Sequence, residues 1–255
     1  MSRSEFESTS LLSSRIHELW SRSVNAGVCT ATSFLTPAEQ YEVTGLARQN
    51  GYDNLYLFGG CKNSERKIAF FLPEYIDRAD FEASDFICAF HAVSKFASPS
   101  HRDYLGAILG LGIKREFVGD IYLSGDDAYF YCLPTVAKHI ALSLDKVGRA
   151  GVKIQQVSLA DVPPREVRTK SVQFTVKSPR LDAVAAGLFS ISRAAAADRI
   201  AAGAVSLNYS GCLKADAAVA PEDILSIRGI GKGHIVSFGG RSRKDRVFVS
   251  GEVYL

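Results

Sequence analysis

The chain has 255 residues, of which 47% are hydrophobic and 22% charged, and this composition is typical of a globular protein and excludes a disordered one. No apolar run approaches the roughly 18 residues that a membrane span needs, and the polar N-terminus lacks a secretory signal, so we expect a cytoplasmic protein that does not enter membranes. The net charge of +3 is distributed unevenly along the chain. Residues 165–255 hold 14 Lys and Arg against 8 Asp and Glu (+6), whereas the preceding residues hold 16 against 19 (−3). This asymmetry hints at nucleic-acid binding.

Residues 1–82 are predicted to form an N-terminal α/β domain of two helices followed by two strands. Leu12, Ile16 and Leu19 recur at helical spacing. The second helix begins with a capping box, in which Thr36 caps and Glu39 stands three positions later, and it ends near residue 51. Apolar runs at 55–58 and 68–72 flank two glycines and a charged turn, which predicts a β-hairpin.

Residues 83–162 are predicted to form a ferredoxin-like middle domain. The apolar pattern indicates, in chain order, a strand, a helix, two strands, a helix and a strand at 86–93, 101–111, 118–123, 128–133, 135–147 and 152–159. This β-α-β-β-α-β order is the ferredoxin-like arrangement. Many RNA-recognition domains use it, but so do many enzymes and regulatory modules, so the fold alone does not decide the function.

Tyr129 and Tyr131 share one face of a predicted strand in the middle domain. Aromatic side chains on such a sheet can stack RNA bases. The basic and glycine residues of the usual RNA-recognition signature are missing, however, so packing in a core or between domains is the preferred interpretation.

The adjacent prolines 163 and 164 mark a boundary, and residues 163–179 are predicted to be a linker in which 172–176 is a candidate strand. Residues 180–255 then form a small α+β domain. Its first helix carries Leu181, Val184 and Leu188 on one face, and Ser192 caps a second helix that stops at Gly203. Strands follow at 205–207, 224–228, 235–238 and 247–253, with a turn at 209–211 and a glycine-rich break at 229–233. The whole chain is therefore expected to be a multidomain α+β protein.

The C-terminal domain gathers basic and polar residues near helix starts and turns. The candidate RNA contacts are Arg180, Ser192, Arg193, Arg199, Asn208, Lys214, Arg228 and Lys232. Arg and Lys bind phosphates, helix N-termini favour anions, and a turn asparagine can bond a sugar or a base edge. The alternative for each arginine is a local ion pair, for example Arg180 with Asp182 or Arg199 with Asp198. For the set as a whole we favour RNA binding.

Three strings in this domain resemble the RNA-binding S4 domain: Arg-Leu-Asp at 180–182, Phe-Ser-Ile-Ser-Arg at 189–193, and Ile-Ala-Ala-Gly-Ala-Val-Ser-Leu-Asn at 200–208. Residues 223–229 are similar to the closing strand of that domain. The resemblance implies that Arg180, Ser192, Arg193, Asn208 and Lys214 lie near the RNA-contacting face.

Strings in the middle domain, at 100–106, 111–115 and 119–121, resemble the YlmH family of bacterial proteins, as does the position of the S4-like domain at the C-terminus. The resemblance spans most of the chain and is loosest over the N-terminal domain. It implies a protein that is encoded beside cell-division genes and associated with the large ribosomal subunit. It also implies a role in ribosome quality control, on subunits blocked by peptidyl-tRNA.

We therefore expect a non-catalytic factor that binds structured rRNA or tRNA on the large ribosomal subunit, without a cofactor. The five cysteines include no CxxC pair and are interpreted as reduced, mostly buried thiols, and the five histidines are scattered, so no metal site is expected. One alternative is an RNA-modifying enzyme similar to pseudouridine synthases, with Asp103 or Asp120 as a catalytic carboxylate. Another is an interaction protein of the cell-division machinery.

Overall fold

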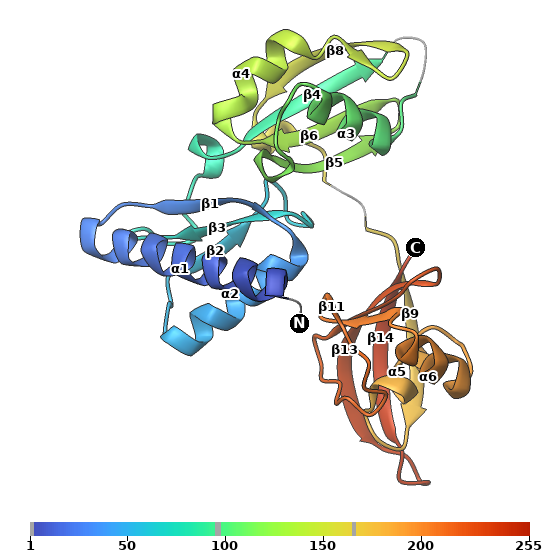
Figure 1. Cartoon of the computed structure of the whole chain (residues 1–255). Helices are drawn as coiled ribbons and strands as arrows, with labels where there is room; N and C mark the ends of the chain where they lie inside the picture. The colour runs from blue at the N-terminus through green and yellow to red at the C-terminus, as the bar shows by residue number, and fades with distance from the viewer. Residues whose placement is uncertain (1–2, 95–97, 165–166) are drawn as a thin grey trace. The chain divides into compact units, whose positions relative to one another are not determined.

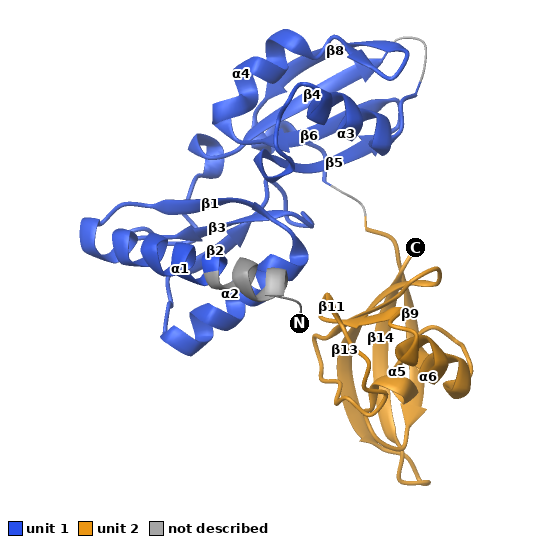
Figure 2. Cartoon of the chain, viewed as in Figure 1, with its two compact units in different colours: residues 1–165 blue, residues 166–255 orange. Residues whose placement is uncertain are grey.

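The computed structural model describes residues 3–94, 98–164 and 167–255, with side chains from residue 11 onward. The chain divides into two compact units, residues 1–165 (unit 1) and 166–255 (unit 2), as Figure 2 shows. Helices and antiparallel sheets occur in both units, so the predicted α+β class is confirmed.

The first half of unit 1 is a three-stranded antiparallel sheet with two helices. Helices α1 (Arg3–Ala26) and α2 (Pro37–Asn50) accompany strands β1 (Thr30–Leu35), β2 (Leu55–Phe58) and β3 (Lys67–Phe71), in the sheet order β1-β3-β2. The predicted hairpin is the β2–β3 pair, and the predicted capping box is present, with the Glu39 N–H 3.3 Å from the Thr36 Oγ1. Strand β1 was missed by the prediction, because its mostly small and polar sequence TATSFL lacks a clear apolar alternation.

The second half of unit 1 follows the predicted order of elements. These are β4 (Cys88–Ser94), α3 (His101–Gly110), β5 (Val118–Ser124), β6 (Asp127–Cys132), α4 (Pro134–Ser143) and β8 (Ala150–Val157), and the sheet order is β5-β6-β4-β8-β7. Both helices pack on one face of this sheet. The second predicted helix ends at Ser143 rather than at Val147, because β7 (Lys146–Val147) pairs with the start of β8 instead.

The two halves of unit 1 share one hydrophobic core. Phe34 and Phe70 of the three-stranded sheet cluster with Ala89 and Tyr131 on the face of the five-stranded sheet opposite its helices. The Tyr131 side chain is completely buried there, whereas Tyr129 is half-buried and stacks on His91 with the ring centroids 4.7 Å apart. Packing therefore accounts for Tyr131, and the predicted boundary at residues 82 and 83 does not separate two compact units.

Unit 2 is a six-stranded antiparallel sheet with two short helices on one face (Figure 1). Its elements are β9 (Thr169–Val176), α5 (Leu181–Leu188), α6 (Arg193–Ala201), β10 (Val205–Leu207), β11 (Ser210–Gly211), β12 (Ile224–Ile227), β13 (Gly231–Arg241) and β14 (Val247–Tyr254), in the sheet order β11-β10-β12-β13-β14-β9. Apolar side chains of both helices, among them Leu181, Leu188 and Ile200, form the core with Ile235 of β13.

The structure corrects the predicted linker at 163–179. Strand β9 belongs to unit 2 and pairs with β14 over eight residue pairs, from Thr169 opposite Tyr254 to Val176 opposite Val247. Residues 165 and 166 of the predicted linker lie outside the described residues.

Two predicted details of the unit 2 strands were wrong. The turn predicted at 209–211 lies at Asn208 and Tyr209, and residues 210 and 211 form β11. Of the glycine-rich stretch at 229–233, only the first two residues interrupt the sheet, because β13 begins at Gly231. Gly233 is buried in that strand, where an added Cβ would lie 2.8 Å from the Leu188 side chain, so the glycine permits the close approach of α5.

Replacing Gly187 by alanine is expected to destabilise unit 2 by about 1–2 kcal/mol. Alanine favours a helix by about 1 kcal/mol relative to glycine, but the added Cβ would lie 2.1 Å from the Phe174 ring, and overpacking of this kind costs about 1–3 kcal/mol or more. Urea unfolding would measure the change. Gly211→Ala is the matched control, because nothing lies within 4 Å of its added Cβ. A Gly187→Ala variant at least as stable as the unchanged protein would contradict the expectation.

Candidate nucleic-acid interface

A buried carboxylate joins the starts of the two helices of unit 2. Asp182, in the first turn of α5, is 5% exposed. One carboxylate oxygen accepts from the Nε of Arg180 at 3.3 Å, and the other accepts from the Nε and Nη2 of Arg193 at 3.0 and 2.9 Å. The arginine side chains remain 42% and 57% exposed. Asp182 therefore holds two guanidinium groups side by side at the surface, with N–H groups still directed to solvent.

Backbone hydrogen bonds at the starts of α5 and α6 position the two arginine side chains. Arg180 is the N-cap residue of α5, and the neighbouring Leu181 N–H donates to the Ala217 carbonyl at 2.9 Å. Ser192 begins α6 as predicted, since its Oγ accepts from the Ala195 N–H at 3.1 Å, and this makes Arg193 the first residue of the helix. The ion pair of Arg180 with Asp182, considered as the alternative to an RNA contact, is therefore present, and Arg193 shares the same carboxylate.

Where α6 and β12 end, the Arg199 guanidinium contacts the backbone of Arg228. The alternative for Arg199 was an ion pair with Asp198. In the structure the Arg199 Nη1 donates a hydrogen bond to the Arg228 carbonyl at 3.4 Å. The Arg228 N–H in turn donates to the Ala204 carbonyl at 2.9 Å, and the Arg228 side chain is exposed. The structure thus brings Arg199 and Arg228 together across 29 positions of the sequence.

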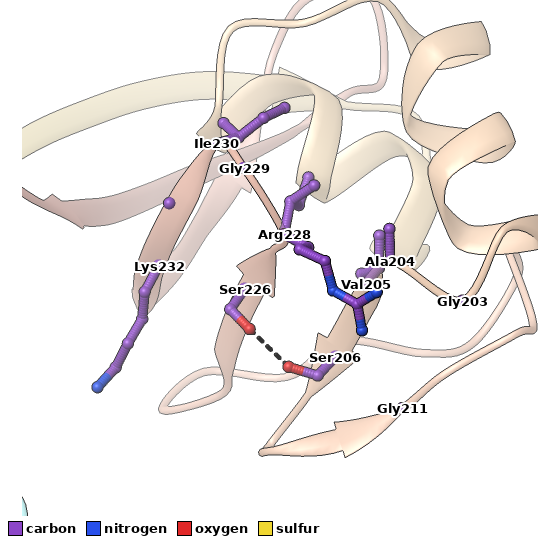
Figure 3. A pocket seen from close by; sticks show the side chains of 12 residues that line it. Gly203, Ala204, Val205, Ser206, Gly211, Ser226, Arg228, Gly229, Ile230 and Lys232 are labelled. Atoms are coloured by element: carbon purple, nitrogen blue, oxygen red, sulfur yellow. Dashed lines mark hydrogen bonds between the residues drawn. The ribbon is translucent and has the colours of Figure 1, made fainter.

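A shallow hollow of about 720 Å³ lies next to Arg228, on strands β10 and β12 and the glycine-rich turn after them. Figure 3 shows the hydroxyl groups of Ser206 and Ser226 bonded to each other, 2.6 Å apart, between the side chains of Arg228 and Lys232. The Lys232 ammonium lies 5.6 Å from the ring centre of Tyr209 and 5.0 Å from that of Tyr254. Hydroxyl groups and two cations around an open hollow are suited to an anionic group such as a phosphate.

Two further predicted contact residues, Asn208 and Lys214, lie on either side of β11. Asn208 has a φ of 50° at the turn between β10 and β11, its Oδ1 accepts from the Ile224 N–H at 3.0 Å, and its Nδ2 donates to Asp223 at 2.8 Å. The amide therefore fixes the turn, and its role as a sugar or base contact stays a prediction. Lys214 is exposed in the loop between β11 and β12, where its carbonyl accepts from Ala217.

The sequence interpretation treated Asp182 only as a local partner of Arg180, and it did not consider Ser206 and Ser226. The sequence did contain a signal for the role of Asp182, because this residue belongs to the S4-like string Arg-Leu-Asp at 180–182. The sequence contains no such signal for the serine pair, because Ser206 and Ser226 become neighbours only through the pairing of β10 with β12.

The aspartates considered as catalytic candidates both have structural partners. Asp103 completes the capping box of α3, where Oδ2 accepts from the Ser100 N–H at 2.8 Å, and the bonds with Ser100 lower the pKa of the Asp103 carboxyl. Asp120 is 7% exposed and accepts the backbone N–H groups of Glu65 and Arg66 at 2.5 and 3.1 Å. Both carboxylates thus have a structural use.

The rest of the described chain contains free thiols but no cluster of metal ligands. Within residues 3–94, 98–164 and 167–255, no three His, Cys, Asp or Glu side chains gather so as to hold a metal ion. The cysteines are free thiols, two of them buried, and burial raises the pKa of Cys88 and Cys132. In the same part of the chain, no helix has the length and apolar surface that a membrane span requires.

Comparison with known proteins relates most of the chain to one family, and the matching family model covers part of unit 1 rather than the surface on unit 2. Residues 77–161 match the family model described as "Putative RNA-binding domain in YlmH". One relative, "Ribosome-associated protein quality control protein P2" of Bacillus subtilis (strain 168), is 34% identical over 217 residues, which are 84% of this chain and 83% of the relative. A solved structure, the cell division protein YlmH from Streptococcus pneumoniae, has 19% identity and a TM-score of 0.48 over 63% of this chain and 95% of that chain.

Fold and surface together define an α+β protein of two units, with a cation-bearing surface on its C-terminal unit. The identity to the Bacillus subtilis relative extends over most of both chains. The chain therefore belongs to the YlmH family, as the sequence resemblance predicted.

Proposed function

We propose that the protein is a non-catalytic RNA-binding factor of the ribosome, and that unit 2 holds structured RNA as an S4-type domain. The observation that carries the proposal is the pair of guanidinium groups of Arg180 and Arg193, fixed at the surface by the buried Asp182. Guanidinium groups held in a fixed geometry bind phosphates through paired charge-assisted hydrogen bonds. The net charge of +6 over residues 165–255 adds a favourable long-range attraction to RNA.

The finer proposal is that the RNA is rRNA or tRNA on the large subunit, in quality control of stalled complexes that carry peptidyl-tRNA. Its support is the Bacillus subtilis relative, whose name is ribosome-associated protein quality control protein P2. The matching family model supports RNA binding in general, through residues 77–161 of unit 1. The structural use of Asp103 and Asp120 favours a binding protein over an RNA-modifying enzyme.

Sucrose-gradient sedimentation with purified bacterial ribosomal subunits tests this proposal. The protein is expected to migrate with the large subunit at low salt and to dissociate as salt rises, because phosphate contacts release counterions. An Arg180→Ala/Arg193→Ala variant is expected to stay at the top of the gradient. If the unchanged protein stayed at the top even at low salt, the ribosomal part of the proposal would be wrong. Binding that survives RNase and high salt would favour a protein partner, such as one of the cell-division machinery.

Replacing Arg193 alone by alanine is expected to weaken RNA binding by about 1–3 kcal/mol, the contribution of a charge-assisted hydrogen bond. Fluorescence titration of a labelled rRNA fragment would measure the change. Arg48→Ala is the control, because Arg48 is an exposed arginine in the last turn of α2. Unchanged affinity in a folded Arg193→Ala variant would remove Arg193 from the binding surface.

A further inference from the structure

The turn between β13 and β14 carries a dense cluster of positive charge that the proposed site does not include. Residues 241–246 read Arg-Ser-Arg-Lys-Asp-Arg, so four of six side chains are cationic and one is acidic. Figure 1 shows this hairpin projecting from unit 2 at the end opposite the C-terminus. We call residues 241–246 the hairpin tip.

The hairpin tip is held in a defined conformation. Arg241 donates to the Asp245 carboxylate at 2.6 Å, and the backbone N–H of Ser242 donates to the Arg246 carbonyl at 2.7 Å. Arg246 is tied to the neighbouring strand β9, since its Nε donates to the Thr175 Oγ1 at 3.0 Å. Arg243 and Lys244 are exposed at the apex between these braces. The fold therefore presents two cations at the end of a two-stranded ribbon whose turn is hydrogen-bonded.

An exposed aromatic ring lies next to the hairpin tip. Phe248 is 49% exposed and stands directly opposite Thr175, the residue that holds Arg246. Across from it, the ladder between β13 and β14 is irregular at Gly239 and Gly240, and an added Cβ at Gly240 would meet no atom within 4 Å. An added Cβ at Gly239 would lie 3.3 Å from the Phe248 Cβ, so Phe248 is flanked on this strand by backbone without a side chain. Cations at a turn beside an accessible aromatic ring are the combination that nucleic-acid surfaces use for phosphates and for bases.

The hairpin tip and the hollow at Lys232 must meet different parts of a ligand. Lys232 and Arg241 lie nine residues apart on the same strand β13, which corresponds to about 30 Å at the usual rise of a strand. Successive phosphates of a nucleic-acid strand are much closer than this, so the two places cannot contact one phosphate or its neighbour.

We infer that the hairpin tip is a second RNA-contacting element, in which Arg243 and Lys244 bind backbone phosphates and the Phe248 ring packs against a base or sugar. This inference rests on the proposed RNA-binding function and names a further part of the surface that performs it. The hairpin tip extends the RNA footprint of unit 2 along the length of β13.

The test compares four variants of the full chain with the unchanged protein for binding to deproteinised 23S rRNA over a range of salt concentrations. Arg243→Ala/Lys244→Ala is expected to bind about tenfold more weakly, and its salt slope is expected to fall by about 1.4, at roughly 0.7 for each lost phosphate contact with a single strand. Phe248→Ser is expected to weaken binding without changing the salt slope, because it removes stacking but no charge.

The control is Arg22→Ala/Arg48→Ala, which removes two exposed cations of α1 and α2, outside the residues 77–161 that match the putative RNA-binding domain. An equal loss in this control would show that only net charge matters and would overturn the inference. If the Arg180→Ala/Arg193→Ala variant loses affinity while the variant at 243 and 244 binds like the unchanged protein, this inference fails and the proposed function stands. If the unchanged protein does not bind RNA, both fail. If the hairpin tip variant binds naked rRNA normally but loses binding to whole subunits, the partner is a ribosomal protein, which also overturns the inference.

Discussion

Replacing Asp120 by alanine is expected to lower the free energy of unfolding of unit 1 by about 4 kcal/mol. The buried carboxylate accepts two backbone N–H groups, those of Glu65 and Arg66, from the segment between β2 and β3. Each buried N–H that loses its acceptor costs about 1–3 kcal/mol, because water does not replace the lost partner.

The effect is large because Asp120 lies where the two halves of unit 1 meet. Arg66, which follows the bonded backbone, donates from its Nε to the Val118 carbonyl at 3.2 Å and from its Nη2 to the Phe34 carbonyl at 2.7 Å. Burial lowers the pKa of Arg66 and brings that of Arg115, next to it, to about 10. The charge of Asp120 raises both pKa values and so offsets part of the cost of these buried cations.

Urea unfolding, followed by circular dichroism, would measure the loss. The control is Asp126→Ala, because Asp126 is an exposed turn carboxylate whose partner is the Ser98 hydroxyl at 3.1 Å. An Asp120→Ala variant destabilised by less than about 1 kcal/mol would mean that the backbone groups find other acceptors. The result also bears on the enzyme alternative, since a catalytic carboxylate is not expected to stabilise the fold to this extent.

The second large effect is expected at Asp182. Replacing it by asparagine is expected to weaken RNA binding about tenfold, or about 1.4 kcal/mol, although the substitution makes unit 2 more positive. An asparagine offers one carbonyl oxygen in place of two charged ones, so it cannot hold Arg180 and Arg193 at the same time with the same strength. The two guanidinium groups then lose their fixed position and must be ordered again when RNA binds.

The direction of this change separates two explanations of RNA binding. If only net charge mattered, Asp182→Asn would bind RNA more tightly and with a steeper salt dependence. If the fixed geometry of the arginines matters, the affinity falls. Asp198→Asn is the control, because Asp198 is an exposed aspartate of α6 and gives the same change in charge. Tighter binding by the Asp182→Asn variant, shown to be folded by circular dichroism, would contradict the proposed arrangement.

Much of the fold could be predicted because its signals are local. The caps at Thr36 and Ser192 are present where the sequence predicts them, since a cap requires only residues three positions apart. The order of elements in the second half of unit 1 follows from apolar periodicity, which is a property of neighbouring residues. Local signals were insufficient at β1 and β9, because these strands are stabilised by pairing with strands that are distant in the sequence.

The candidate site likewise has some features that the local sequence determines and others that depend on the tertiary structure. The sequence by itself determined that basic residues gather in the last third of the chain, and that Ser192 and Arg193 begin a helix there. Only the tertiary structure decided that Asp182 joins Arg180 to Arg193, that the Asn208 amide is used within its own turn, and that Tyr131 is buried. The reason is physical: helix caps and periodicity depend on a few consecutive residues, whereas burial and shared hydrogen bonds depend on which distant segments the folded core brings into contact.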